Sequence, residues 1–360
     1  MNSLFRYLLR LSFSNFAITF LAGIGLFEVI DLFERVDSLL QHHPPLSLFL
    51  LYFIYKLPFV MTQIAPAAVL ITIVLTMGYL LRHREWLIFQ SSGVHPLRIF
   101  LPLYTFAFIV SLGTLFIQEL AVPFTQYRSE WTMKVQIQQR KPLGLYRSES
   151  VWYRDGNNFY YIKLLLHEEN SLRGITILTL NDDFQVMKRT DAASAHYTPE
   201  GWALEEVWIR FFENGKIIDM QRLNQATGLI PQTPADFETV IQKAETMTHR
   251  ELSRFIRRLE SEGFDAISYR VDWHARLSTP WSGLALALVA PFIVLLLVHR
   301  GGIFTGIGLS FVLGFLYWLS LGFSLSLGRS GILPPIVSAW STHLLFCILG
   351  AILARRLKWT

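Results

Sequence analysis

The sequence predicts an integral membrane α-helical bundle of six transmembrane helices with an inserted all-β domain. Three observations favour this fold class. First, 52% of the residues are hydrophobic and only 16% are charged, whereas soluble globular domains contain about 25% charged residues. Second, apolar runs long enough to span a bilayer occur in two groups of three. Third, segment 123–276 between the groups contains short runs rich in β-branched and aromatic residues.

The first three apolar runs belong to residues 1–122. A membrane-spanning helix needs about 20 mainly apolar residues. The second run exceeds that length, and Pro58 and Pro66 within it indicate kinks or an extension beyond the bilayer. The expected spans are Leu11–Phe33, Ser47–Leu81 and Leu97–Val122.

The last three apolar runs belong to residues 277–360. The expected spans are Leu277–Val298, Ile303–Leu327 and Ile332–Ala354. The fifth span has a small residue at every fourth position, which lets another helix approach closely. The small residues are Gly302, Gly306, Ser310 and Gly314. Packing within the chain and a seam with a second membrane subunit explain this stripe equally well.

Positive charge sets the expected orientation, because Lys and Arg concentrate on the cytoplasmic side of membrane proteins. With the N-terminus inside, the short outer segments hold only Arg35, Lys56 and Arg329. The inner segments hold Arg6, Arg10, Arg82, Arg84, Arg98, Arg300, Arg355, Arg356 and Lys358. We therefore expect both termini and segment 82–92 in the cytoplasm, and segment 123–276 on the outer side.

Most of segment 123–276 has the pattern of β-strands. Val151–Arg154 and Phe159–Leu166 flank the sequence Asp-Gly-Asn-Asn, which is typical of a hairpin turn. Further short strands at regular spacing are typical of a sandwich, a jelly roll or an open barrel. The segment ends in an amphipathic helix that Thr248 and Glu251 cap. Its apolar face consists of Leu252, Phe255, Ile256 and Leu259.

No motif for nucleotide binding, nucleophilic catalysis or metal binding occurs in the chain. There is no G-x-x-x-x-G-K-[ST] loop, no G-x-S-x-G elbow and no H-E-x-x-H pair. We therefore expect no enzymatic activity and no cofactor, so that energy for any transport comes from a partner. His42 and His43 fit a solvated loop pair, because two ligands alone do not make a metal site. His343 fits a structural hydrogen bond better than a proton relay.

The end of the first span carries charged residues on one helix face. Glu28, Asp31 and Arg35 are spaced at i, i+3 and i+7. Because a charge at the centre of a bilayer costs about 2.5–3.5 kcal/mol, these residues should face a partner helix or a polar cavity. Two interpretations stay open. The residues line the rim of a cavity for a charged amphiphile, or the helix simply emerges into water with an Asp31–Arg35 pair.

Segment 82–92, between the second and third spans, has more features than a connection requires. It combines charged residues with large apolar ones and ends in a helix stop. Exposed apolar side chains beside charges mark a contact surface. The alternative is an interfacial helix anchored in the lipid by Trp86. The candidate contact residues are Arg82, Arg84, Glu85, Trp86, Phe89 and Gly93.

Three motifs follow one another along the chain: "REWLIFQSSGVHPLRI", "VWYRDGNNFYYI" and "ISYRVDWHARLSTPWSGLALALVAPFIVL". They resemble, in order, the cytoplasmic coupling helix, the start of the periplasmic domain and the entry into the fourth span of the lipopolysaccharide export permeases, the LptF/LptG family. The G-type subunit is the more similar of the two types. Together with the arrangement of three spans, a β domain and three spans, the resemblance covers nearly the whole chain.

The resemblance implies a multi-pass protein of the bacterial inner membrane with a periplasmic β-jelly-roll domain. It implies the permease subunit of an ABC transporter that extracts lipopolysaccharide from that membrane and passes it to a periplasmic jelly-roll bridge for export to the outer membrane. The implied partners are a cytoplasmic ATPase dimer, a second six-span permease, a single-span jelly-roll subunit and the bridge protein. No nucleic acid is expected.

The resemblance also implies roles for individual residues. Glu85 matches the glutamate that docks in a groove of the ATPase. The residues expected to contact lipopolysaccharide are Arg35, Arg128 and Lys134, with Glu28 and Asp31 beside them. The chain departs from the G-type pattern near Glu34, where the family has a lysine followed by Val-Asp. Two alternatives stay open: Arg35 substitutes for the lysine, or the phosphate contact is weaker or absent.

Two other classes of function compete with transport. A membrane-anchored receptor or scaffold would bind a ligand with its outer β domain, independently of any ATPase. A lipid-modifying enzyme would use Glu28 and Asp31 as acid and base, but the chain offers no nucleophile beside them.

Overall fold

The computed structural model describes residues 2–42, 45–138, 145–147, 150–166, 171–181, 185–199, 201–213, 215–234, 247–261 and 265–356. The chain forms two compact units. The helical unit comprises Met1–Glu130 and Ala244–Thr360, and the sheet unit comprises Trp131–Lys243. The amphipathic helix before the fourth span belongs to the helical unit, so the sheet unit is shorter at both ends than segment 123–276.

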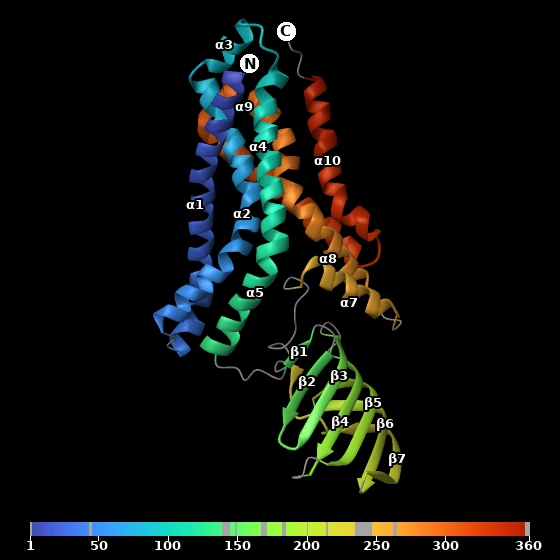
Figure 1. Ribbon diagram of the computed structural model, residues 1–360. Helices are drawn as coiled ribbons and strands as arrows, with labels where there is room; N and C mark the ends of the chain where they lie inside the picture. The colour runs from blue at the N-terminus through green and yellow to red at the C-terminus, as the bar shows by residue number, and fades with distance from the viewer. Residues whose placement is uncertain are drawn as a thin grey trace. The chain divides into compact units, whose positions relative to one another are not determined.

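The first half of the helical unit begins with two long helices that are joined by a short connection (Figure 1). They are α1 (Asn2–His42) and α2 (Leu46–Arg82), followed by the short α3 (Glu85–Ser91) and by α4 (Pro96–Phe116). The chain continues through the π-helical turn η1 (Ile117–Ala121) and α5 (Val122–Trp131). The second π-helical turn, η2 (Thr132–Ile137), already belongs to the sheet unit.

The second half of the helical unit begins with the amphipathic helix. Its elements are α7 (His249–Ser261), α8 (Ile267–Ser278), the 3-10 turn η4 (Thr279–Trp281), α9 (Ser282–Arg329) and α10 (Pro335–Arg356). The predicted cap of α7 is present, since the Thr248 amide donates to the Glu251 carboxylate at 2.8 Å and the Glu251 amide donates to the Thr248 hydroxyl at 3.3 Å.

Among the described residues, six helical segments are long and apolar enough to cross a membrane. They are Ser3–Val36, Leu46–Arg82, Pro96–Trp131, Ile267–Leu295, Gly308–Arg329 and Pro335–Arg355. The predicted six-span bundle is thereby confirmed. The fourth span starts earlier than Leu277, because α8 continues its helix through η4 into α9.

The helix α9 contains two spans that lie side by side. The Tyr317 hydroxyl donates to the Ser282 hydroxyl at 2.8 Å, although 35 residues separate the two. Gly283 and Gly314 also face neighbouring residues of α2, Val69 and Leu70. Because Gly283 and Gly314 both face the same part of α2, the chain changes direction between them.

The core of the helical unit is built mainly from α2, α4 and α9. In the most apolar stretch of α2, 67% of the residues are buried within the chain, against 6% in the equivalent stretch of α1. The α1 side chains Ile18, Leu21 and Phe33 are exposed. Such a helix needs lipid or another subunit beside it, because its apolar surface is far larger than a soluble protein leaves uncovered. The largest fully buried core side chains include Tyr317, Phe100, Phe106 and Leu70.

The sheet unit is one antiparallel sheet of seven strands in sequential order (Figure 1). The strands are β1 (Leu145–Arg147), β2 (Ser150–Asp155), β3 (Asn158–Leu166), β4 (Ser171–Leu180), β5 (Val186–Thr198), β6 (Gly201–Glu213) and β7 (Lys216–Thr227). Asp155 pairs with Asn158, and Gly156 has φ +58° in the turn between them, as the hairpin prediction requires. The predicted inserted β domain is confirmed, and its described strands form a meander without Greek-key crossovers.

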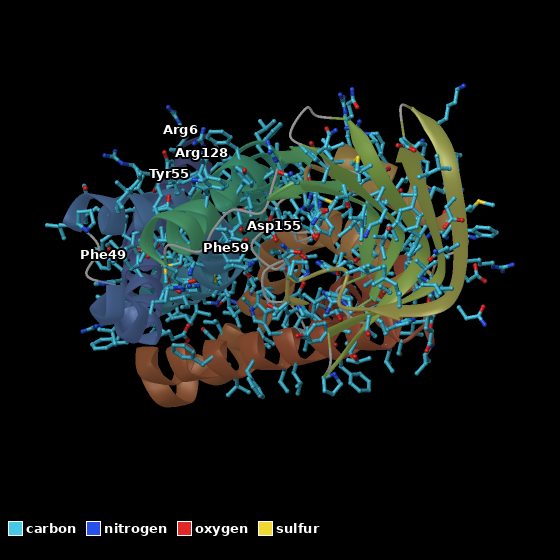
Figure 2. All side chains as sticks on the ribbon, turned by 90° about the horizontal axis from the view of Figure 1, so that it is seen from below. Arg6, Phe49, Tyr55, Phe59, Arg128 and Asp155 are labelled. Atoms are coloured by element: carbon cyan, nitrogen blue, oxygen red, sulfur yellow. The ribbon has the colours of Figure 1, made fainter. Side chains whose placement is uncertain are left out.

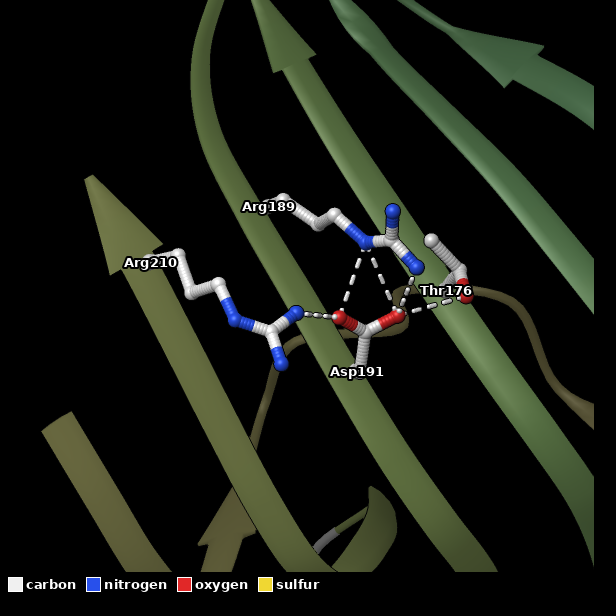
Figure 3. Close-up of polar contacts among 4 residues, drawn as sticks. All are labelled: Thr176, Arg189, Asp191 and Arg210. Carbon is white, nitrogen blue, oxygen red and sulfur yellow. Dashed lines mark hydrogen bonds and ion pairs between the residues drawn. The ribbon is translucent and has the colours of Figure 1, made fainter. Parts of the chain in front are cut away.

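The two faces of the sheet differ in chemistry. One face packs an apolar core that includes Tyr160, Ile175 and Trp202. On β4 to β6, the other face carries the ion-pair cluster of Figure 3, in which Asp191 accepts hydrogen bonds from Thr176, Arg189 and Arg210. Because these residues come from three neighbouring strands, the cluster ties β4, β5 and β6 together.

Candidate functional site

The connection between α2 and α3 is a tight turn of defined geometry. The His83 amide donates to the Tyr79 carbonyl at 3.0 Å and ends α2. Arg84 then has φ +59°, a left-handed conformation that non-glycine residues seldom adopt. This single residue reverses the chain, so that α3 starts at once with Glu85.

The carboxylate of Glu85 is bound by α1. The Tyr7 hydroxyl lies 3.1 Å from Glu85 Oε1 and 3.0 Å from Oε2, so it donates to the carboxylate as a whole. Tyr7 was not among the predicted site residues, because 78 residues separate it from Glu85. No local sequence pattern indicates a contact between residues so far apart.

The helix α3 presents one face to the core and the other to its surroundings. Trp86 is only 3% exposed and stacks on Phe100 of α4, with ring centroids 5.9 Å apart. Phe89 is half-buried against the same core. Leu87 and Ile88 are 55% and 59% exposed. Trp86 and Phe89, which were predicted as contact residues, therefore hold α3 in place, and the exposed apolar pair is Leu87 and Ile88.

The periodicity of α3 could have indicated this division. Trp86 and Phe89 are three residues apart and share a helix face, while Leu87 and Ile88 point elsewhere. The basic residues Arg82 and Arg84 are exposed next to this apolar pair. The exposed surface of the segment thus combines two guanidinium groups with two aliphatic side chains.

The end of α3 has the predicted stop. Gly93 has φ +70°, and its amide donates to the Gln90 carbonyl at 2.9 Å. The Val94 amide donates to Phe89, and the His95 side chain then accepts from the Leu97 amide at the start of α4. The turn at Arg84 and the stop at Gly93 therefore set where α3 begins and ends between α2 and α4.

A buried cluster of charges joins α1 and α2. Asp31, 4% exposed, accepts from Arg35 Nε at 3.0 Å and from Lys56 Nζ at 2.5 Å. The Tyr52 hydroxyl donates to the other carboxylate oxygen at 3.1 Å. The predicted Asp31–Arg35 pair is present, but Lys56 and Tyr52 complete the site. The lysine was counted only as an outer charge, although its place in an apolar helix already indicated a partner.

Glu28 lies one turn before Asp31 on α1. Its side chain is half-buried, and neither carboxylate oxygen has a hydrogen-bond partner within the described part of the chain. An unpaired carboxylate beside the Asp31 cluster favours a polar surrounding at this end of the unit. Asp31 itself faces residues of the neighbouring helix α2, Tyr52 and Lys56.

Arg128 lies on the third span, and Lys134 comes shortly after its end. The guanidinium of Arg128 is exposed on α5 and lies 5.5 Å from the centroid of the Phe124 ring (Figure 2). Lys134 belongs to η2, and its side chain lies outside the described residues.

A cavity of about 290 Å³ opens among α2, η1, α5, α7, α8 and α9. Its polar lining includes Gln63, Arg276 and the ion pair of Asp272 with Arg329. Phe59, labelled in Figure 2, belongs to the apolar lining. Arg276 is buried and donates to the Met247 carbonyl. Ligand pockets usually measure about 300–1,000 Å³, so this cavity is too small for a lipid with several acyl chains.

Beside the cavity, an aromatic pair joins α7 to α8. His249 and Trp273 have ring centroids 4.3 Å apart. Burial lowers the pKa of His249, and the nearby Glu119 carboxylate opposes the shift without cancelling it. The described residues contain no group of three or more His, Cys, Asp or Glu that could hold a metal ion.

The remaining sequence candidates are structural or lie outside the described part. His343 Nε2 is 3.0 Å from the Tyr317 hydroxyl, which fits the structural hydrogen bond favoured above. Gly314 of the small-residue stripe faces Leu70, and Ser310 is buried, so this part of the stripe packs within the chain. Side chains at positions 302 and 306 are not described, and His43 lies outside the described residues.

These features can be compared with known proteins. Residues 6–356 match the family described as lipopolysaccharide export system permease LptF/LptG. The chain belongs to this family. The match runs from α1 to α10 and covers both the helical unit and the sheet unit.

Two curated relatives carry the name lipopolysaccharide export system permease protein LptG. They come from Escherichia coli strain K12 and from Escherichia coli O6:H1, strain CFT073. Each is 27% identical over 280 residues, which is 76% of this chain and 76% of the relative. Within the LptF/LptG family, the G-type resemblance of the sequence motifs agrees with these matches.

Proposed function

We propose that this chain is a permease subunit that exports lipopolysaccharide from the bacterial inner membrane, driven by a separate ATPase. The observation that carries the proposal is the family match over residues 6–356, on a chain with six spans and an inserted sheet unit. Both termini and α3 lie in the cytoplasm in this proposal, and the sheet unit lies in the periplasm, as the distribution of Lys and Arg favours.

The ATPase would dock on α3. Glu85, Arg82 and Arg84 supply the charged contacts, while Leu87 and Ile88 supply an apolar patch. Trp86, Phe89 and the Gly93 stop support this surface from behind. A rigidly supported helix suits coupling, because a movement imposed on it passes to α2 and α4 as a rigid-body shift.

The cargo would bind outside the small cavity, against exposed apolar surfaces. Each buried CH₂ group contributes about 0.8 kcal/mol, so removing several acyl chains from a bilayer requires a large apolar surface elsewhere. The exposed faces of α1 and of the second span of α9 offer Leu21, Phe33, Phe311 and Phe315. A second six-span permease facing these helices would close a shared cavity.

The phosphate groups of the cargo would meet the charged end of α1. Arg35 keeps part of its side chain accessible while it pairs with Asp31. Arg128 is exposed on the third span, and Lys134 follows it in the sequence. Lys56, buried against Asp31, would hold the cluster together, and the unpaired Glu28 would limit how closely a phosphate approaches.

The sheet unit would pass the cargo onwards to a periplasmic jelly-roll bridge, with a single-span jelly-roll subunit as an additional partner. Its edge strand β7 is exposed along nearly its whole length, including Ile217 and Ile218. An exposed apolar edge strand is suited to pairing with a strand of another protein.

The proposal is tested by purifying the tagged chain in detergent from the bacterium that encodes it and identifying bound proteins by mass spectrometry. We expect a P-loop ATPase and a second six-span permease with the wild type. Glu85→Arg should lose the ATPase and keep the permease, while the exposed charge reversal Glu213→Arg on the sheet unit should lose neither. A wild-type chain without an ATPase would contradict the proposal, and an ATPase retained by Glu85→Arg would contradict the role of that residue.

A further inference from the structure

Tyr7 contacts Glu85 but is not itself part of the proposed docking surface on α3. The Tyr7 hydroxyl lies 3.0–3.1 Å from both oxygens of the Glu85 carboxylate. A hydrogen bond to a charged group is stronger than one between neutral groups. The bond therefore restrains the direction in which Glu85 points.

Tyr7 is itself held in place by the packing of α1. Its neighbour Leu8 is fully buried in the core. Further along α1, the Asn15 side chain donates to Thr76 at 3.0 Å, and the Thr19 hydroxyl is 3.1 Å from that of Thr72. These contacts with α2 fix the rotation of α1 about its axis, and with it the face of α1 that carries Tyr7.

The same helix carries the charge cluster at its other end. Tyr7 and Asp31 both belong to α1, and at a rise of about 1.5 Å per residue they lie roughly 36 Å apart along the axis. The helix α3 thus contacts both α4 and α1. Trp86 packs on Phe100 of α4, and Glu85 is bound by Tyr7 of α1.

We propose that Tyr7 is a positioning residue for coupling. It orients the Glu85 carboxylate and ties α3 to α1, so that a movement of α3 shifts the α1 helix whose far end carries Asp31 and Arg35. This inference rests on the proposed function, because Tyr7 positions a residue of the proposed docking site. Without the Tyr7 hydroxyl, α3 stays attached to α4 through Trp86, and its hydrogen bond to α1 is lost.

The test compares Tyr7→Phe, which removes only the hydroxyl, with Tyr55→Phe. Tyr55 lies on α2, and no hydrogen bond of its hydroxyl is present in the described part of the chain. The complete transporter is reconstituted in vesicles that contain lipopolysaccharide. Three quantities are measured: the ATPase retained on purification, the rate of ATP hydrolysis, and the lipopolysaccharide transferred per ATP hydrolysed.

We expect Tyr7→Phe to retain the ATPase within about twofold of the wild type but to transfer about tenfold less lipopolysaccharide per ATP, as the loss of one hydrogen bond to a charged group allows. Tyr55→Phe should match the wild type in all three measurements. Unchanged transfer per ATP in Tyr7→Phe would overturn the inference and leave the proposed function standing. A wild type that binds no ATPase would overturn both.

A folding defect has a different signature. If Tyr7→Phe only destabilised the protein, its thermal unfolding midpoint and its yield would fall, and transfer and ATP hydrolysis would decline together with an unchanged ratio. That result would also overturn the positioning role.

Discussion

The ammonium group of Lys56 lies 2.5 Å from the carboxylate of Asp31, and this ion pair joins α1 to α2. Asp31 is 4% exposed and Lys56 is 7% exposed. Arg35 and Tyr52 bind the same carboxylate. The cluster therefore joins α1 to α2 near one end of α1, while the Asn15–Thr76 and Thr19–Thr72 contacts join the two helices further along.

Asp31→Asn should destabilise the helical unit by about 3–5 kcal/mol, since removing one partner leaves the buried Lys56 charge uncompensated. Lys56→Met alone should also destabilise it, because the Asp31 carboxylate then loses its closest cation. The double variant should lose less stability than the sum of the two single losses, as for any pair in direct contact. Thermal unfolding in detergent measures all four proteins, and strictly additive losses would contradict the coupling.

Trp86→Ala should cost about 3–5 kcal/mol, as truncation of a large buried aromatic side chain does, and should also weaken ATPase binding. Leu87→Ala should weaken ATPase binding without a measurable change in stability, since Leu87 is 55% exposed. Unfolding midpoints and ATPase retention separate the two effects. A stable Trp86→Ala protein with normal ATPase binding would show that α3 does not depend on the Phe100 stack.

The Asp191 cluster of the sheet unit should respond to pH. Burial raises the pKa of the Asp191 carboxyl, but the hydrogen bonds from Arg189 and Thr176 and the charges of Arg189 and Arg210 outweigh this, so its pKa lies below its usual value. The stability that the carboxylate contributes is therefore present above the usual aspartate pKa, about 3.9. It is lost as the pH falls through the lowered pKa.

Asp191→Asn should remove this dependence and destabilise the strands at neutral pH by about 1–2 kcal/mol, a modest value because Arg189 and Arg210 are partly exposed. Hydrogen exchange of peptides from β4 to β6, corrected for the intrinsic effect of pH, measures the change. Asp219→Asn on the exposed strand β7 serves as the control. Equal protection in Asp191→Asn and the control would disprove the role of the cluster.

Two glycines in helices should behave in opposite ways when replaced by alanine. At Gly350 of α10, a Cβ atom would lie 2.9 Å from the backbone oxygen of Leu288, which can move only with α9. Gly350→Ala should therefore cost about 1–3 kcal/mol, more than the gain in helix propensity. At Gly322 of α9 nothing lies within 4 Å, so Gly322→Ala should be neutral or stabilise by up to about 1 kcal/mol. Unfolding midpoints of both variants, side by side, provide the test.

The sequence by itself determined the elements, because they depend on local patterns. The length and composition of the apolar runs predicted six spans. Two runs rich in β-branched and aromatic residues, with an Asp-Gly-Asn-Asn turn between them, predicted the β2–β3 hairpin. The caps at Thr248 and Gly93 followed from residues within one helical turn. In each case the residues that decide the structure are close together along the chain.

Only the tertiary structure decided which side chains meet. Lys56 pairs with Asp31 across two helices, and Tyr7 reaches Glu85 over 78 residues. Trp86 turned from an expected contact residue into a support, because Phe100 of α4 covers its ring. The two spans of α9 meet through Tyr317 and Ser282. These contacts depend on how helices pack and rotate against one another, and an apolar run predicts an apolar environment without specifying which neighbour supplies it.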